Sequence, residues 1–168
     1  MAETKIYIDD KVDGALREIA MKRFGYGRGS ISKAVEEAVV QWLRMQDNIN
    51  SKISRIVEAA KSNEKVVAVI LFGSYARKEA DYKDVDIAVL LEDGSDSFVE
   101  LNRLDVIGAY EDRMFDIAVL NDVPLEIKRR ILNEGIVVYT KDSSALYNYS
   151  IKVIRDIDEF GCIPNTMR

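Results

Sequence analysis

The stretch LFGSYARKEADYKDVDIAV, Leu71–Val89, combines the end of an apolar segment, a turn of small residues, a basic run and the closely spaced pair Asp84 and Asp86. Together with the preceding VVAVI, residues 66–72 form an uninterrupted apolar run rich in branched side chains. Such a run is typical of a strand that is buried on both faces. A second apolar run, VDIAVLL, starts at Val85. The turn at Gly73 and Ser74 is therefore expected at the end of the first of two buried strands.

Two acids lie at the start of the second apolar run. Asp84 directly precedes the second strand and Asp86 lies inside it. Because side chains alternate along a strand, these two carboxylates are expected on the same side. At about 4 Å and an effective dielectric constant of about 20, two such charges repel by roughly 4 kcal/mol. A bound cation would relieve this repulsion, and hard oxygen ligands suit Mg²⁺ best. The alternative is a pair of solvated aspartates without a role.

A third apolar run, MFDIAVL at residues 114–120, contains one further acid, Asp116. A carboxylate inside such a run costs free energy unless it is paired or liganded. If this strand lies beside the one that carries Asp86, three carboxylates meet opposite the Gly73–Ser74 turn. That turn offers backbone N–H groups and a hydroxyl, which suit phosphate oxygens. The alternative is an Asp116 that faces the edge of the sheet.

The rest of this half predicts helices and one more strand. Helices are expected at residues 98–110, from Pro124 to a stop at Gly135, and along an apolar stripe that runs from Leu146 to Ile157. The segment IVVYT, residues 136–140, is expected to be a strand.

Composition limits the chemistry. The chain has 168 residues, 48% of them hydrophobic and 32% charged, with a net charge of −5. No apolar run is long enough to span a bilayer and the N-terminus has no export pattern, so a cytoplasmic protein is expected. The absence of histidine and the single cysteine, Cys162, exclude imidazole catalysis, a Cys/His zinc cluster and a disulfide framework. Acid–base chemistry therefore falls to carboxylates, lysine or tyrosine.

The first fifty residues carry a separate pattern. Alternation of Ile6 and Ile8 with Lys5 and Tyr7 predicts a short strand. Helical spacing follows over residues 12–20, with Asp9 or Asp10 as N-cap, and again over residues 31–43 after the turn GYGRGS, where Ser30 is the expected cap. One strand and two helices cannot bury this apolar surface alone. A symmetric partner that pairs its strand with this one is therefore expected.

This module, residues 4 to about 46, resembles the ribbon-helix-helix family of DNA-binding dimers, in which paired strands enter the major groove. By that resemblance, Lys5 and Tyr7 would face bases, while Arg28, Gly29 and Ser30 would hold a DNA phosphate. The alternative is a dimerisation module without DNA affinity. It is favoured by Asp9 at the end of the strand and by the charge balance of residues 1–50, which hold eight basic and eight acidic side chains.

The second half resembles the minimal nucleotidyltransferases, a branch of the DNA polymerase beta superfamily, over about residues 52–160. Its motif is Gly-Ser, nine residues, and then Asp-x-Asp with apolar flanks, here Gly73, Ser74, Asp84 and Asp86. The later FDIAVLND matches the family's third acidic strand, which makes Asp116 the counterpart of the third carboxylate. A lysine stands where serine commonly precedes the first aspartate.

The resemblance implies a metal-dependent transfer of a nucleoside monophosphate, AMP from ATP, to a hydroxyl acceptor. Two Mg²⁺ ions, for which Mn²⁺ could substitute, would be held by the three carboxylates. The implied site comprises the catalytic and metal-binding residues Asp84, Asp86 and Asp116 and the nucleotide-binding residues Gly73, Ser74 and Arg77. Such proteins often act as antitoxins that adenylylate a tyrosine of a HEPN-type toxin, and a DNA-binding arm would suit repression of a shared operon.

The expected fold is α+β: a ribbon-helix-helix-like homodimerisation module at residues 1–47, followed at residues 48–168 by a nucleotidyltransferase-fold mixed β-sheet flanked by helices. The poor helix formers of DNINS, residues 47–51, place the boundary there, although Ile49, Ile53 and Ile56 continue the helical spacing and permit one long helix. The alternative function is a ribbon-helix-helix transcription regulator whose second domain senses a nucleotide without catalysis.

Overall fold

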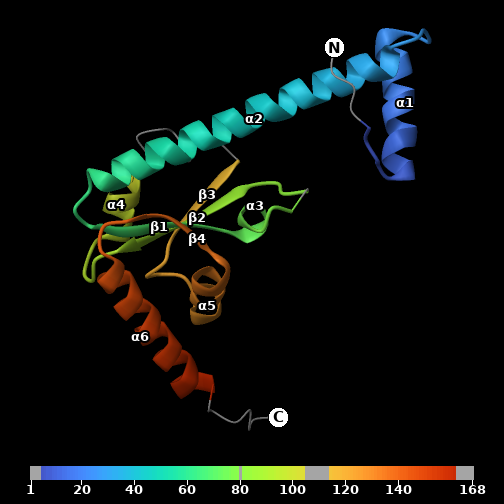
Figure 1. Cartoon of the computed structure of the whole chain (residues 1–168). Helices are drawn as coiled ribbons and strands as arrows, with labels where there is room; N and C mark the ends of the chain where they lie inside the picture. The colour runs from blue at the N-terminus through green and yellow to red at the C-terminus, as the bar shows by residue number, and fades with distance from the viewer. Residues whose placement is uncertain (1–4, 80, 105–113, 162–168) are drawn as a thin grey trace. The chain divides into compact units, whose positions relative to one another are not determined.

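The computed structural model describes residues 5–79, 81–104 and 114–161, whose helices and strands are drawn in Figure 1. The chain forms two compact units, Met1–Ser51 and Lys52–Arg168. Six helices and a four-stranded mixed sheet in the described ranges confirm the predicted α+β class. In these ranges no helix is both long and apolar enough to cross a membrane.

The first unit contains α1 (Asp10–Phe24) and the start of α2 (Ser30–Lys61). The carboxylate of Asp9 accepts a 2.9 Å hydrogen bond from the backbone N–H of Lys11, which confirms one of the two expected N-caps. Residues 5–9 form neither helix nor strand in this single chain, unlike the predicted strand. The physical reason is that an isolated strand has no neighbour to bond its backbone groups.

Ser30 is the first residue of α2 rather than a cap in front of it. Its hydroxyl lies within hydrogen-bond distance of the carbonyl oxygens of Gly25 and Gly27, at 2.5 and 2.9 Å, and the residue is only 6% exposed. Ser30 thus stabilises the turn between the helices. An ion pair between Arg23 of α1 and Glu37 of α2 adds a second link between them.

Helix α2 continues through residues 47–51, so the predicted boundary lies inside one long helix, the alternative that the apolar spacing permits. Poor helix formers cost only a few tenths of a kcal/mol each relative to better ones. The apolar side chains of Ile49 and Ile56 are fully buried, and burying such a side chain contributes about 1.5–3 kcal/mol. The helical spacing of the apolar residues therefore outweighs the local preference for a break.

The second unit is built on a sheet with the strand order β3-β2-β1-β4. Its strands are β1 (Val66–Phe72), β2 (Val85–Leu91), β3 (Phe115–Val119) and β4 (Ile136–Thr140). Strand β2 pairs with β3 in parallel, whereas β1 is antiparallel to both β2 and β4. Every residue of β1 is buried, as its apolar run predicts. The end of β1 therefore lies at the same edge as the starts of β2 and β3.

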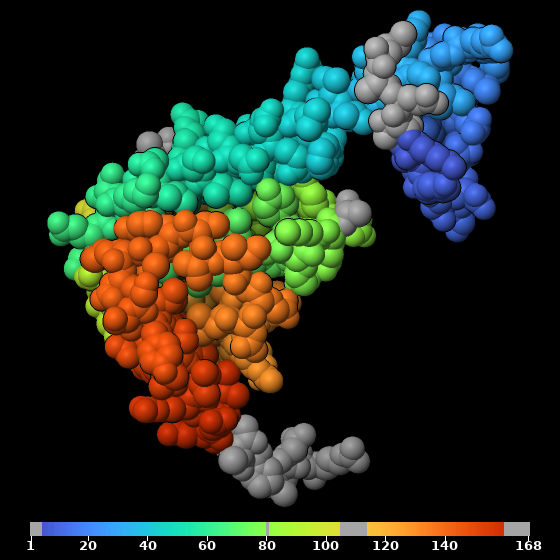
Figure 2. All heavy atoms as spheres, viewed as in Figure 1, coloured from blue at the N-terminus to red at the C-terminus, as the bar shows by residue number. Residues whose placement is uncertain are grey.

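Helices α3 (Gly73–Ala76), α4 (Ser97–Leu104), α5 (Leu125–Glu134) and α6 (Ser143–Gly161) complete this unit. The predicted helix at 98–110 is confirmed as far as residue 104, and the remainder lies outside the described residues. One face of the sheet packs against α5 and α6, and its buried core includes Ala68, Ile70, Ala88, Leu90, Leu120 and Ile131. Figure 2 shows α5 and α6 side by side on the surface of this unit.

Gly135 fixes the position of α5 against the sheet. A Cβ at this residue would lie 2.4 Å from the backbone oxygen of Ile131 and 2.5 Å from Cγ2 of Ile70 on β1. Only a glycine lets the helix end so close to the strand. Because Ile131 is itself fully buried, the rotation of α5 about its axis is defined.

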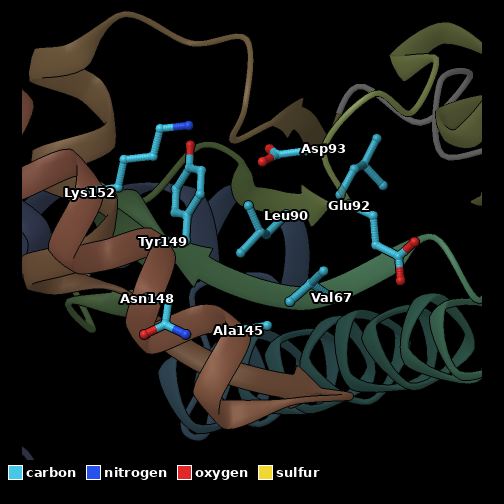
Figure 3. Close-up of a pocket in the computed structure, with 9 residues that line it drawn as sticks. Val67, Leu90, Glu92, Asp93, Ala145, Asn148, Tyr149 and Lys152 are labelled. Atoms are coloured by element: carbon cyan, nitrogen blue, oxygen red, sulfur yellow. The ribbon is translucent and has the colours of Figure 1, made fainter.

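A cavity of about 330 Å³ lies between α6 and the edge of the sheet where β1 starts and β2 ends (Figure 3). Val67 and Leu90 line it from the strands, and Tyr149 lines it from α6. The Tyr149 hydroxyl donates a 3.1 Å hydrogen bond to the carbonyl oxygen of Leu120. Burial, reinforced by nearby carboxylates, raises the pKa of Tyr149 to about 12. The phenol therefore stays neutral at physiological pH and can keep donating.

We expect Tyr149→Phe to lower the free energy of unfolding by about 1 kcal/mol near neutral pH, because one hydrogen bond is lost. Since the unfolded tyrosine ionises near pH 10 and the folded one near 12, the wild type should lose stability as pH rises between these values. The slope should stay below about 1.4 kcal/mol per pH unit because the group is partly exposed. Denaturant titrations at pH 9 and pH 11 should show the gap between wild type and variant shrinking. The exposed Tyr147, changed to Phe on the same helix, should show no such trend.

Candidate active site

Parallel pairing brings two of the predicted acids together. Asp86 is the second residue of β2 and Asp116 the second residue of β3, and the register places them side by side. Asp86 is also aligned with Phe72, the last residue of β1. Asp84 directly precedes β2, and its charge acts on the Asp86 carboxylate. Three carboxylates thus gather at the edge of the sheet where β1 ends.

Asp86 packs directly over the Gly73 turn. A Cβ at residue 73 would lie 1.8 Å from Oδ2 of Asp86 and 2.7 Å from its Cγ. The φ of Gly73 is +72°, a left-handed conformation that side chains rarely adopt. Glycine is therefore required here for two independent reasons: the backbone conformation and the space that the carboxylate occupies.

The acids influence one another electrostatically. Burial raises the pKa of Asp86, and the charges of Asp84 and Asp116 raise it further, while those of Arg130 and Arg77 lower it. Asp84 and Asp86 are half-buried, whereas Asp116 is exposed. The site therefore holds more negative charge than its own cations neutralise, which favours the binding of a cation.

The donor set fits divalent magnesium. Across the residues that the structure describes, no three acidic, histidine or cysteine side chains form a ready-made metal cluster. Magnesium, however, is usually held by one or two carboxylates together with water and the phosphates of a substrate. Three neighbouring carboxylates that do not close around a point match this open mode of binding.

Ser74 and Arg77 occupy the predicted phosphate side of the site. Ser74 is half-buried in α3, and its hydroxyl makes no hydrogen bond with any residue in the described ranges. Arg77 follows α3 and is exposed; its Nε lies 2.6 Å from Glu79 and its Nη1 lies 3.1 Å from Glu134 of α5. The guanidinium is therefore held in place by two carboxylates.

Sequence reasoning missed Arg130 and Glu134 of α5. Their spacing of four residues puts them on one face of a helix. That spacing could have been noted, but only the burial of Ile131 shows which face of α5 meets the sheet.

The predicted DNA-contacting residues belong to the first unit. There Lys5, Tyr7 and Arg28 are exposed, the Lys5 ammonium lies 5.1 Å from the centre of the Tyr7 ring, and Ser30 is buried.

A mixed sheet that carries acids on adjacent parallel strands beside a Gly-Ser turn is the arrangement that the nucleotidyltransferase motif predicts. The family model described as "Polymerase beta, Nucleotidyltransferase" matches residues 54–144, more than half of the chain. The chain belongs to this polymerase beta-type nucleotidyltransferase family, as its motif predicts. No curated protein sequence matches it.

Several solved structures have a similar fold. A toxin–antitoxin with AMP-PNP is 20% identical with a TM-score of 0.52, over 66% of this chain and 87% of that chain. The toxin–antitoxin MntA–HepT is 18% identical with a TM-score of 0.50, over 66% and 88%. A tri-AMPylated Shewanella oneidensis HEPN toxin in complex with MNT antitoxin is 20% identical with a TM-score of 0.48, over 68% and 88%.

Proposed function

We propose that the second unit transfers AMP from ATP to a hydroxyl group of a protein acceptor and releases pyrophosphate. The observation that carries this proposal is the close contact of the Asp86 carboxylate with Gly73, with Asp84 and Asp116 nearby. A nucleotide whose phosphates lie over this turn would reach the carboxylates directly. Membership of the nucleotidyltransferase family supports the same reaction class.

Asp84 and Asp86 would hold two Mg²⁺ ions, with Asp116 as a further ligand of one of them. When bound, the ions would neutralise the charge that develops on the phosphate oxygens. The hydroxyl of Ser74 and the backbone at Gly73 would orient the terminal phosphates, and Arg77 would supply a positive charge nearby. These contacts would align the α-phosphate for in-line attack.

In the transfer step, the acceptor oxygen would form a bond to the α-phosphorus while the bond from that phosphorus to the bridging oxygen breaks. The displaced group is pyrophosphate, and the proton of the hydroxyl would go to the carboxylate of Asp116. Asp116 suits this role because it is exposed and adjacent to Asp86 in the register. An exposed base can meet a bulky acceptor.

We propose that the acceptor is a tyrosine of a HEPN-type toxin. Solved complexes of similar fold are toxin–antitoxin pairs, one of them with AMP-PNP, which supports both a toxin partner and an adenine nucleotide. A tyrosine presents its hydroxyl at the end of a rigid side chain, which suits a site open at the edge of a sheet. A pair of this kind would work in the cytoplasm.

Labelled nucleotide tests this proposal. The full chain would be incubated with Mg²⁺, the protein encoded next to it and ATP labelled at either the α- or the γ-phosphate. We expect the α-label, but not the γ-label, to become attached to the acceptor, and a chelator to stop the transfer until Mg²⁺ or Mn²⁺ is restored. Transfer of the γ-label would instead identify a phosphotransferase. No transfer to any acceptor, combined with promoter binding, would identify the nucleotide-sensing regulator.

For the first unit, the proposed role is homodimerisation in the ribbon-helix-helix manner. Its apolar residues Ile6, Ile8, Val39, Trp42 and Leu43 are each 44–55% exposed. Such a surface costs free energy in water, and a second copy would cover it. The same partner would supply the neighbour that residues 5–9 lack for strand pairing.

Operator DNA is the proposed ligand of that dimer. Among the described basic residues of α1, Arg17, Lys22 and Arg23 form ion pairs with acidic side chains. Lys5 and Arg28 have no ion pair within the described ranges. Lys11, Lys33 and Arg44 of this unit likewise have no ion pair with a described residue, and Lys5 and Arg28 are the two of these five that the ribbon-helix-helix resemblance directs at DNA.

We therefore expect Arg28→Gln to weaken binding to the chain's own promoter by about tenfold and to reduce the dependence of log K on log salt by about one unit. Lys22→Gln is the matched control, because Lys22 already pairs with Glu18. Mobility shifts at several salt concentrations measure both quantities. Equal effects of the two variants would contradict the proposed contact and favour a module that only dimerises.

A further inference from the structure

Helix α5 turns one particular face toward the acid site. Glu134 near its end pairs with Arg77, which directly follows α3 and the Ser74 turn. Arg130 lies four residues earlier on the same face of the helix. The buried Ile131 and the close contact of Gly135 with β1 prevent α5 from rotating away from this orientation.

Asp86 points toward the side of the sheet that α5 covers. Along β2, Asp86 alternates with Val85 and Ile87 and shares its side with Ala88 and Leu90. Ala88 and Leu90 pack in the same buried core as Ile131 of α5. The positive charge of Arg130 lowers the pKa of Asp86, in agreement with this placement.

Arg130 differs from Arg77 in its partners. Arg77 donates to both Glu79 and Glu134, whereas Arg130 has no hydrogen bond or ion pair with any described residue. Its side chain is exposed. A planar guanidinium can bind a phosphate group through two parallel hydrogen bonds, and Arg130 is available to do so.

We propose that Arg130 binds the β- and γ-phosphates of the incoming nucleoside triphosphate, on the α5 side of the carboxylate site. The inference rests on the proposed transfer reaction and assigns that reaction a residue outside its sequence motif. Arg130 would then stabilise the pyrophosphate as it leaves, while Arg77 stays anchored to its two glutamates. The site would be lined by α3 on one side and by α5 on the other.

Equilibrium binding of two nucleotides to the full chain tests this role. The probes are α,β-methylene-ATP, which keeps three phosphates but cannot transfer AMP, and AMP, which lacks the β- and γ-phosphates. In the presence of Mg²⁺, Arg130→Gln should weaken the triphosphate analogue at least about tenfold, as expected for the loss of charge-assisted hydrogen bonds. Its affinity for AMP should change less than about twofold, and Arg130→Lys should recover part of the loss.

Arg129→Gln is the matched control. Arg129 is the adjacent exposed arginine of α5, and the same change in net charge there should leave both affinities unaltered. Equal effects of the two glutamine variants, or equal losses of the analogue and AMP in Arg130→Gln, would overturn the assignment. A wild type that binds neither nucleotide with Mg²⁺ or Mn²⁺ would overturn the proposed function itself, and with it this role of Arg130.

Discussion

Asp86→Asn should reduce nucleotidyl transfer by about 10³-fold or more while leaving the fold intact. Asp86 pairs with Asp116 in the register, is influenced by the charge of Asp84 and lies against Gly73, so the proposed metal and phosphate contacts converge on it. Asparagine keeps the size of the side chain but removes the charge that would hold a divalent ion. Initial rates of α-label transfer with saturating Mg²⁺ and acceptor measure the effect.

The control for this substitution is Asp81→Asn. Asp81 is an exposed acid in the segment that leads into β2, and its loss changes the net charge by the same amount. The control should transfer at nearly the wild-type rate. If Asp86→Asn and the control were equally active, the acid cluster would have no catalytic role.

Asp86→Asn, which should reduce transfer, should at the same time increase the stability of the metal-free protein. Because the pKa of Asp86 is raised above its usual value, the ionised carboxylate destabilises the metal-free fold above that usual value. The metal-free wild type should therefore become more stable as pH falls through the raised pKa, whereas Asp86→Asn should lack this gain and be more stable at pH 7. A variant that lost both activity and stability would point to a packing role instead. Thermal unfolding in the presence of a chelator at pH 4–7 distinguishes this electrostatic effect of Asp86 from a packing role.

The strands and the spacing of Asp84 and Asp86 could be predicted from the sequence because the signals for them are local. The run from Val66 to Phe72 has no polar position and is rich in branched side chains, which favours a fully buried strand, as observed. The two-residue period places Asp84 and Asp86 together without knowledge of any neighbour. Whether Asp116 lies beside Asp86 depended on the pairing of β2 with β3, which joins strands that are far apart in the chain.

Features that depend on packing between distant parts of the chain could not be predicted from local patterns. The continuous α2 depends on the burial of Ile49 and Ile56, which a local count of poor helix formers ignores. Residues 5–9 alternate like a strand, but a strand also needs a neighbour, and a single chain does not provide one. Arg130 follows Arg129 without any local difference, and only the rotation of α5 distinguishes the two.

Gly73→Ala should abolish transfer as completely as loss of an acid, although it removes no chemical group. The new Cβ would lie 1.8 Å from Oδ2 of Asp86, so that carboxylate must leave its place beside Asp84 and Asp116. The left-handed φ of +72° adds about 1–2 kcal/mol of backbone strain for any residue with a Cβ.

Gly94→Ala separates these two effects, because Gly94 has a φ of +79° but an added Cβ there would meet no atom within 4 Å. Both variants should lose about 1–2 kcal/mol of unfolding free energy from backbone strain, and Gly73→Ala should lose more because of the clash. Only Gly73→Ala should lose transfer. Measured together, denaturant titration and label transfer would show whether the turn serves the reaction by holding Asp86 in position. An active Gly73→Ala would mean that the carboxylate can work from elsewhere, and the close seat of Asp86 on the glycine would then be incidental to catalysis.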